Sequence, residues 1–173
     1  MAERKQYTRP ANFPTSVQVG GVEVPTISST STLTNKTINA PVGLRAVETL
    51  ITTRVLTLAD SGKTFFLDLV GGFTVTLPTV STAAGFYARF YVKTAPTTAY
   101  IIQTGNSAEQ KLAGLVFSGA GADEDSEVDF TGTNVNFVAS TAVINDSCEI
   151  ECDGAGWYAR CFCNATGGIT ITG

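Results

Sequence analysis

The sequence predicts an all-β protein: an extended N-terminal arm, residues 1–43, followed by a compact antiparallel β-sandwich of jelly-roll type, residues 44–173. Three observations predict this class. Apolar and polar residues alternate over several short stretches, as they do on strands, where successive side chains point to opposite faces. Turn signals containing glycine separate these stretches. Thr, Val and Phe recur, whereas charged residues make up only 15% of the 173 residues, which favours strands over helices.

The arm differs in composition from the rest of the chain. Ser and Thr are frequent in it, and one strand is expected over residues 16–24, around Gly20 and Gly21. Four prolines interrupt it: Pro10, Pro14, Pro25 and Pro41. Because so few large apolar side chains cannot offset the entropy lost on ordering, we expect the arm to become structured only against a partner or against other copies of itself.

Charge is unevenly distributed along the chain. The formal net charge is -4, yet the first ten residues contain Arg4, Lys5 and Arg9 against Glu3. A basic tip on an acidic body predicts an arm that docks on an acidic partner, and the alternative is a solvated terminus without a partner. The acidic balance argues against a protein that binds the phosphate backbone of a nucleic acid.

The N-terminal residues also indicate where in the cell the protein is made. Its basic residues have no apolar segment behind them, so it does not resemble a secretory signal. The apolar runs of the chain are shorter than the ~20 residues of a membrane-spanning helix. We therefore expect a protein that is made in the cytoplasm and has no membrane partner.

The domain begins with an apolar, Thr-rich stretch, residues 44–58. Part of it fits a helical period, but its Thr content and its second half favour a strand. A hairpin is expected next, over residues 60–78, where two alternating stretches are joined by Gly71 and Gly72, which supply the positive φ angles of a tight turn. The second strand should end at Pro78, because proline cannot donate a hydrogen bond to the ladder.

The rest of the domain repeats this pattern. Further strands are expected over residues 86–93, 100–104 and 111–117 and in the I-T-I-T tail. Two more hairpins are expected: residues 128–130 pair with 135–139 around T-G-T-N, and residues 148–152 pair with 157–163 around D-G-A-G. Many short strands at this spacing, with hardly any helix, are typical of a sandwich or jelly roll.

Four cysteines lie in the last of these hairpins, at positions 148, 152, 161 and 163. Folding the hairpin at Gly154 and Ala155 places Cys148 opposite Cys161 and Cys152 opposite Trp157. Thiols spread along two strands do not converge on a tetrahedral zinc site. We therefore interpret them as buried, reduced core thiols. A cross-strand Cys148–Cys161 disulfide is the next alternative, and a metal site is the third.

No catalytic or metal-binding set is evident in the sequence. The chain has no His, which removes the commonest general base and the commonest metal ligand, and no carboxylate pair stands beside a recognisable signature. The acidic stretch over residues 123–129 is interpreted as a solvated loop, with a Ca²⁺ site as the alternative, although its spacing differs from that of an EF-hand. The expectation is a non-enzymatic protein without a cofactor.

Two regions resemble bacteriophage virion proteins. T-L-T-N-K-T-I-N-A-P, residues 32–41, resembles the connector that recurs in phage tail-fibre and head-fibre proteins just ahead of a β-rich C-terminal domain. Residues 60–78, together with F-Y-V-K-T-A-P-T-T-A-Y (90–100) and G-W-Y-A-R-C-F-C (156–163), resemble the compact β-domain of phage decoration and fibre proteins.

The resemblance implies a homotrimer on the virion, at the capsid surface, with the N-terminal part attached to the particle and the β-domain outward. The candidate docking residues for the major capsid protein or another virion protein are Arg4, Lys5 and Arg9. Pairing of three arms would bury side chains that one copy exposes. The candidate trimer contacts in the connector are Leu33, Asn35, Lys36 and Ile38.

Three functions are compared. The first is a capsid decoration, or cement, protein that stabilises the assembled capsid, and the short chain favours it. The alternative is a short tail or head fibre whose β-domain is an adhesin for a host surface glycan or protein. Tyr87, Tyr91 and Trp157 would then line the binding surface, unless they only pack within the strands. The third is a small hydrolase acting on host polysaccharide, and the missing catalytic set argues against it.

Overall fold

The structure is a computed structural model that describes residues 17–19, 22–24, 45–105, 112–119 and 130–173. The chain divides into two units, Met1–Val42 and Gly43–Gly173. In the first unit, β1 (Val17–Val19) pairs with β2 (Val22–Val24) in antiparallel register. The single strand predicted over residues 16–24 is therefore wrong. In the sequence the two strands are separated by two glycines, residues that hairpin turns favour.

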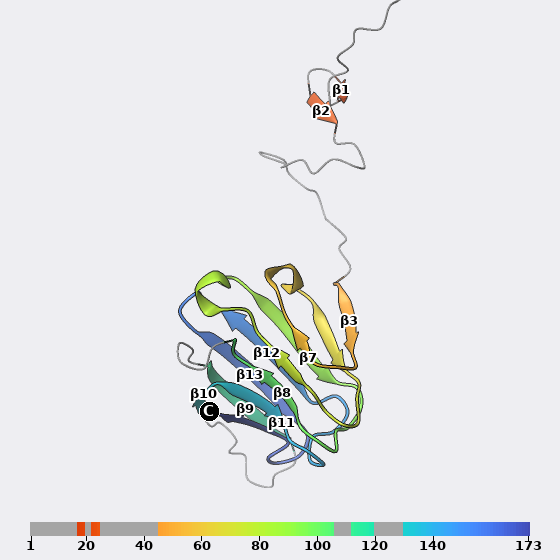
Figure 1. Cartoon of the computed structure of the whole chain (residues 1–173), viewed down its shortest axis with the longest axis vertical. Coiled ribbons are helices and arrows are strands. Elements are labelled where there is room, and N and C mark those ends of the chain that lie inside the picture. The colour runs from red at the N-terminus through yellow and green to blue at the C-terminus, as the bar shows by residue number, and fades with distance from the viewer. Residues whose placement is uncertain (1–16, 20–21, 25–44, 106–111, 120–129) are drawn as a thin grey trace, which may run out of the picture. The chain divides into compact units, whose positions relative to one another are not determined.

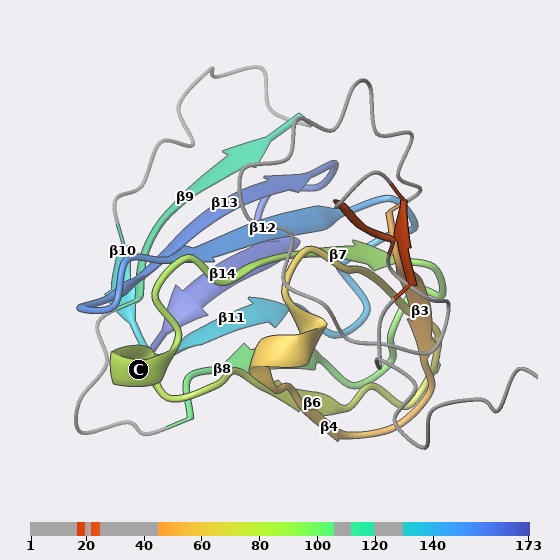
Figure 2. The same cartoon turned by 90° about the horizontal axis from the view of Figure 1, so that it is seen from above.

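The second unit is a β-sandwich of two sheets (Figures 1 and 2). The seven-stranded sheet has the order β10-β9-β13-β12-β7-β5-β3, and the five-stranded sheet has the order β14-β11-β8-β6-β4. The strands of the first are β3 (Val47–Leu50), β5 (Thr64–Leu67), β7 (Tyr87–Val92), β9 (Leu112–Ser118), β10 (Phe130–Gly132), β12 (Ser147–Cys152) and β13 (Trp157–Cys163). Those of the second are β4 (Arg54–Val55), β6 (Thr74–Thr76), β8 (Tyr100–Gln103), β11 (Asn134–Phe137) and β14 (Ile169–Thr172). Two short 3₁₀ turns, η1 (Leu58–Asp60) and η2 (Val80–Thr82), lie in connections.

The predicted all-β sandwich is confirmed, and its sheets are mixed rather than antiparallel throughout. β7, β12 and β13 pair antiparallel, as do β8, β11 and β14. Five neighbouring pairs run parallel: β3–β5, β5–β7, β9–β13, β4–β6 and β6–β8. The reason is the order of connections. From β3 to β8 the chain alternates between the two sheets, so each strand lies beside the one two steps earlier and runs in the same direction.

The hairpin predicted over residues 60–78 is wrong for the same reason, since β5 and β6 belong to different sheets. The turn itself is present: the Gly72 N–H donates to the Leu69 carbonyl over 2.9 Å, and Gly72 has a φ of 63°. A Cβ at Gly72 would collide with the Thr98 carbonyl, so the turn also depends on a close backbone approach. The hairpin predicted around T-G-T-N is likewise replaced by a crossing from β10 to β11.

The core lies between the sheets and is built from alternate residues of the strands. In β7 and β13, every second side chain is buried. The largest fully buried side chains include Trp157, Tyr100, Phe65, Phe90 and Phe137. The buried Tyr100 hydroxyl donates to the Thr94 carbonyl over 2.9 Å, so this polar group is satisfied inside the apolar core.

The single strand predicted over residues 44–58 is also wrong, because this stretch contains two strands, β3 and β4, which belong to different sheets. The strands predicted over 86–93, 100–104 and 111–117 and in the tail are confirmed as β7, β8, β9 and β14. The hairpin around D-G-A-G is also confirmed, with Cys148 opposite Cys161 and Cys152 opposite Trp157. In the described part of the chain, no helix is long and apolar enough to cross a membrane.

Candidate functional site

The two outer faces of the sandwich differ in chemistry. The outer face of the five-stranded sheet is mostly small and polar, with Thr74, Thr76, Gln103, Asn136 and Thr170 among its side chains. These groups bond to each other: the Gln103 amide donates to the Thr76 hydroxyl over 3.0 Å, and the Asn136 amide donates to the Thr172 hydroxyl over 2.9 Å. The polar groups of this surface already have hydrogen-bond partners within the sheet, which is typical of a face in contact with solvent.

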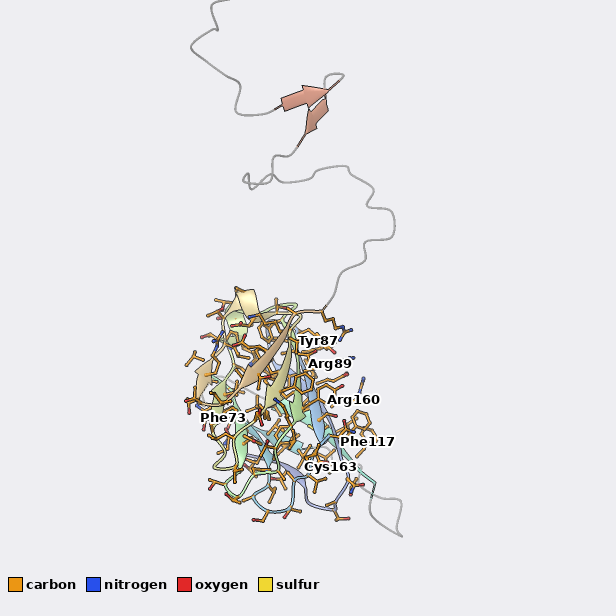
Figure 3. The ribbon with its side chains drawn as sticks, turned by 90° about the vertical axis from the view of Figure 1, so that its right-hand side faces the viewer. Phe73, Tyr87, Arg89, Phe117, Arg160 and Cys163 are labelled. Carbon is orange, nitrogen blue, oxygen red and sulfur yellow. The ribbon has the colours of Figure 1, made fainter. Side chains whose placement is uncertain are left out.

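The outer face of the seven-stranded sheet is aromatic and charged instead. Because alternate residues of its strands point away from the core, the same strands that supply the core also supply this face. Among the residues whose side chains the structure describes, its aromatic members are Phe66, Tyr87, Tyr91, Phe117, Tyr158 and Phe162. Figure 3 shows Tyr87, Arg89, Arg160 and Phe117 along one side of the domain, and Phe73 on the other. We call this surface the aromatic face.

One row of the aromatic face crosses the sheet as stacked pairs. Phe66 stacks on Tyr91 with ring centroids 5.8 Å apart, and Phe117 stacks on Phe162 with centroids 5.2 Å apart. Ser147 lies between the pairs, since it is opposite Tyr91 on one side and opposite Phe162 on the other. Phe162 is 47% exposed and Phe117 is 37% exposed, so the second pair presents apolar surface to solvent.

A charged row runs beside the stacked row. The register places Glu149 between Arg89 and Arg160, and Arg89 Nη2 lies 2.6 Å from Glu149 Oε1. The Arg89 guanidinium also lies over the Tyr87 ring, 5.6 Å from its centroid, which is a cation–π contact. Arg160 is exposed and, among the described residues, forms none of the ion pairs within 4.0 Å.

A third row holds a tyrosine in a fixed position. The Tyr158 hydroxyl donates to Asp153 Oδ2 over 3.0 Å, and this hydrogen bond raises the pKa of Tyr158. The Asp153 carboxylate also accepts from the backbone N–H groups of Ala155 and Gly156, both at 2.7 Å, and these bonds lower the pKa of Asp153. The 52% exposed Tyr158 ring is thus anchored at its tip while one side faces solvent.

The aromatic face carries several hollows. One, of about 370 Å³, is lined by side chains that include Leu115, Glu151, Tyr158 and Arg160. Another, of about 470 Å³, is lined by mainly apolar groups that include Val47, Phe66, Tyr91 and Ile144. A third, of about 490 Å³, lies beside Phe117 and Phe162. Hollows of this kind on a sheet face accept side chains that protrude from a partner.

The four cysteines are buried, as predicted, and none forms a disulfide. Cys148 and Cys161 face each other with their sulfur atoms 3.0 Å apart. Burial raises the pKa values of the Cys148, Cys152 and Cys163 thiols, so the reactive thiolate is disfavoured. Among the described residues, no three His, Cys, Asp or Glu side chains come together in a way that could hold a metal ion.

The predicted site residues of the arm, Arg4, Lys5, Arg9, Leu33, Asn35, Lys36 and Ile38, lie outside the described residues, as does the acidic stretch over residues 123–129. Tyr87 and Tyr91 are on the aromatic face, as the adhesin interpretation requires. Trp157 is fully buried, so for this residue the alternative, packing within the strands, is confirmed. It lies in phase with the buried Cys161 on β13.

Sequence reasoning missed Tyr158, Arg160 and Phe162. The signal was available, because these residues alternate with Trp157, Ala159 and Cys161 in a strand whose inner row had been identified. Comparison with protein-family models, with curated proteins and with solved structures finds no match to this chain.

Proposed function

We propose that the chain is a non-enzymatic structural protein of a bacteriophage virion: a homotrimeric decoration protein that binds the assembled capsid and stabilises it. The resemblance of residues 32–41 to the connector of phage fibre proteins supports the phage origin. The division of the chain between Val42 and Gly43 supports an attachment arm joined to a separate domain.

The observation that carries the proposal is the contrast between the two outer faces. Tyr and Arg are the residues that dominate protein–protein binding energy, and the aromatic face contains both, partly exposed and held in place by neighbours. Five strands at about 4.8 Å spacing make a surface roughly 24 Å wide. With three rows of side chains its area is on the order of 500 Å², which is somewhat more than half of the ~800 Å² that each partner contributes to a stable interface.

Stabilisation of a capsid follows from these contacts by mass action. A protein that binds only the assembled shell, and not its free subunits, shifts the equilibrium towards the shell. Repetition over many symmetric sites multiplies the effect of contacts that are individually weak. A broad face with partly exposed aromatic and charged side chains suits this task.

Binding to capsids tests the proposal. Full-length chain should cosediment with capsids of the phage that encodes it. The double variant Tyr158→Ala with Phe162→Ala should bind at least about 30-fold more weakly, as expected when contacts worth ~2 kcal/mol are lost. The matched control, Thr74→Ala with Thr170→Ala on the five-stranded sheet, should bind like the unmodified chain. Equal binding by both double variants would contradict the role of the aromatic face.

A second candidate is a short tail or head fibre whose β-domain is a host-binding adhesin. It is favoured by Tyr87 and Tyr91, because partly exposed aromatic rings beside Arg89 suit a glycan or protein ligand as well as a capsid. Copy number separates the candidates. Decoration requires on the order of hundreds of copies per particle, whereas a tail fibre requires on the order of ten or fewer.

A further inference from the structure

Two of the four buried cysteines face each other near the middle of the seven-stranded sheet. Cys148 of β12 is directly opposite Cys161 of β13, and both side chains are fully buried. Figure 2 shows β12 and β13 side by side. The two sulfur atoms are 3.0 Å apart, which is about 1 Å more than the ~2.05 Å bond of a disulfide. A small movement of either side chain therefore brings them within bonding distance.

The backbone around this pair also has the spacing that a disulfide needs. On the other side of β12, the Val92 N–H donates to the Asp146 carbonyl over 2.8 Å, and the Cys152 N–H donates to the Phe86 carbonyl over 3.0 Å. Every second residue of a strand directs its backbone groups to the same neighbour, so Cys148 bonds to β7 and not to β13. At such a non-hydrogen-bonded position, opposite Cα atoms approach to ~4.5 Å. This separation lies inside the range that disulfides span, ~4.4–6.8 Å.

The other two cysteines lie outside the reach of such a bond. Cys152 is opposite Trp157 rather than another thiol. Cys163 follows Cys161 by two residues on the same strand, so their side chains run parallel and do not converge. The same register makes Cys163 a diagonal neighbour of Cys148, with Cα atoms ~7–8 Å apart, which is more than a disulfide spans. The geometry thus selects a single pair.

We propose that Cys148 and Cys161 form a reversible disulfide when the protein meets an oxidant, and that this bond locks β12 to β13. A small disulfide such as glutathione disulfide is a sufficient oxidant. One cysteine thiolate attacks it and releases a glutathione thiolate, and the second cysteine then displaces the glutathione that the first has bound. One Sγ–Sγ bond forms and one small disulfide is reduced to two thiols, while the two cysteine protons pass to the two glutathione sulfur atoms.

Burial makes this oxidation slow. Both side chains are closed off from solvent, and burial raises the pKa of the Cys148 thiol, so the attacking thiolate is disfavoured. Oxidation therefore proceeds when β12 and β13 separate locally, and it takes place in an oxidising medium but not in a reducing cytoplasm. The transfer of the protein from one medium to the other on a released virion rests on the proposed function, whereas the chemistry of the pair does not.

The bond joins two strands that carry much of the aromatic face. β13 supplies Tyr158, Arg160 and Phe162, and β12 supplies Glu149. A cross-link between neighbouring strands removes conformations from the unfolded chain and prevents β12 from separating from β13. The oxidised domain should therefore be more stable than the reduced domain, with the same residues on its outer face.

Chemical mapping of the full chain tests the proposal. Reduced protein is incubated with glutathione disulfide, with and without urea below the unfolding transition, then unfolded in guanidinium and alkylated with iodoacetamide. Only Cys152 and Cys163 should be alkylated, and peptide mapping should recover one cross-link, between Cys148 and Cys161. Dithiothreitol should restore four alkylated cysteines. Four alkylated cysteines in both incubations, a cross-link between any other pair, or a stable glutathione adduct at Cys148 or Cys161 would overturn the proposal.

Two serine variants give a matched comparison on the same strand. Cys148→Ser should lose the cross-link and leave its three remaining thiols open to alkylation. Cys152→Ser removes another buried thiol of β12 and should keep the cross-link, with Cys163 as its one alkylated residue. Loss of the cross-link in both variants, or its retention in Cys148→Ser, would contradict the assigned pair.

Urea unfolding of the oxidised and reduced forms of the unmodified chain tests the effect of the bond without any variant. Both forms should have the same near-ultraviolet circular dichroism spectrum, and oxidation should lower the equilibrium constant for unfolding at least about tenfold. An altered spectrum, or an oxidised form that is no more stable, would overturn the inference that the bond locks the native hairpin. None of these measurements involves capsids, so their failure would leave the proposed function standing, and failure to bind capsids would leave this inference standing.

Discussion

Asp60 is an ionised group in an almost fully buried position, with a side chain that is only 3% exposed. Its Oδ2 accepts from the Thr57 N–H at 2.9 Å and from the Thr57 hydroxyl at 3.1 Å, while Lys63 and Arg54 contact Oδ1. Burial opposes ionisation, but the hydrogen bonds from Lys63 and Thr57 outweigh it and lower the pKa of Asp60 from 3.8 to about 2.

The pKa of Asp60 predicts an acid-sensitive contribution to stability. Because the folded-state pKa lies below the unfolded value, the contribution is present above about pH 4 and is lost as the pH falls towards 2. Its size is about 2 kcal/mol. Urea unfolding at pH 7 should show Asp60→Asn to be less stable by about this amount, and the difference should shrink as the pH approaches 2. A difference that is independent of pH would contradict the assignment.

The cysteines give a second prediction at the scale of single residues. Since all four are buried and burial raises the pKa of Cys148, Cys152 and Cys163, thiol reagents should leave the native domain unmodified. After unfolding in guanidinium under non-reducing conditions, all four thiols should react. Fewer than four reactive thiols after unfolding would indicate a disulfide, and rapid modification of the native protein would contradict the burial.

Strand periodicity was sufficient to assign the four cysteines to the core, but the same periodicity was not used to identify the exposed residues between them. The register that faces Cys148 with Cys161 followed from the turn alone, because a hairpin fixes its own pairing. The same alternation places Trp157 on the inner row with Cys161, in agreement with its burial. It would also have assigned Tyr158 to the surface, but the outer row of this strand was not followed.

At the scale of elements, β9 provides a sharp test of packing. Gly114 points into the core, where an added Cβ would collide with the Ile171 side chain and come within 3.2 Å of Ala159. Gly114→Val should therefore destabilise the domain by about 1–3 kcal/mol through overpacking. Ala113→Val, on the outer side of the same strand, is the control and should change stability by less than about 0.5 kcal/mol. Equal losses of stability in urea would contradict the inward orientation of Gly114.

The strands themselves could be predicted from the sequence, whereas their partners could not. Alternation identified β7, β12 and β13 and their buried rows, because that pattern is local. A glycine turn reports a reversal of the chain but not whether the next strand joins the same sheet. The turn at Gly72 leads to the other sheet, and the parallel pairs result from that choice. The pairing of strands that are distant in the chain cannot be predicted from the pattern of residues within one short stretch.

The whole molecule combines a domain that forms its own core with an N-terminal unit that precedes it in the chain. Removal of residues 1–43 should leave the β-domain folded, with an unchanged circular dichroism spectrum, because the buried core identified in the described part of the chain belongs to the second unit. The truncated protein should no longer bind capsids, since attachment needs the contacts of the arm in addition to those of the aromatic face. Capsid binding by the truncated protein equal to that of the full chain would contradict the role of the arm.

The aromatic face could not be recognised as one surface from the sequence. Its residues come from β5, β7, β9, β12 and β13, and only the strand order brings Phe66 beside Tyr91 and Phe117 beside Phe162. The alternation of inward and outward residues could be seen in each strand of the sequence. Which outward residues share one face depends on the pairing of strands that are distant in the chain. The central claim concerns what this face and the arm do together on a particle.

Imaging of intact virions at a resolution that locates single domains is the measurement that tests this claim most directly. The account predicts the sandwich on the capsid surface at symmetric positions, in groups of three, with the aromatic face against the shell. Absence of the chain from the capsid, with the domain found only at the tip of a tail fibre or not on the particle at all, would contradict it.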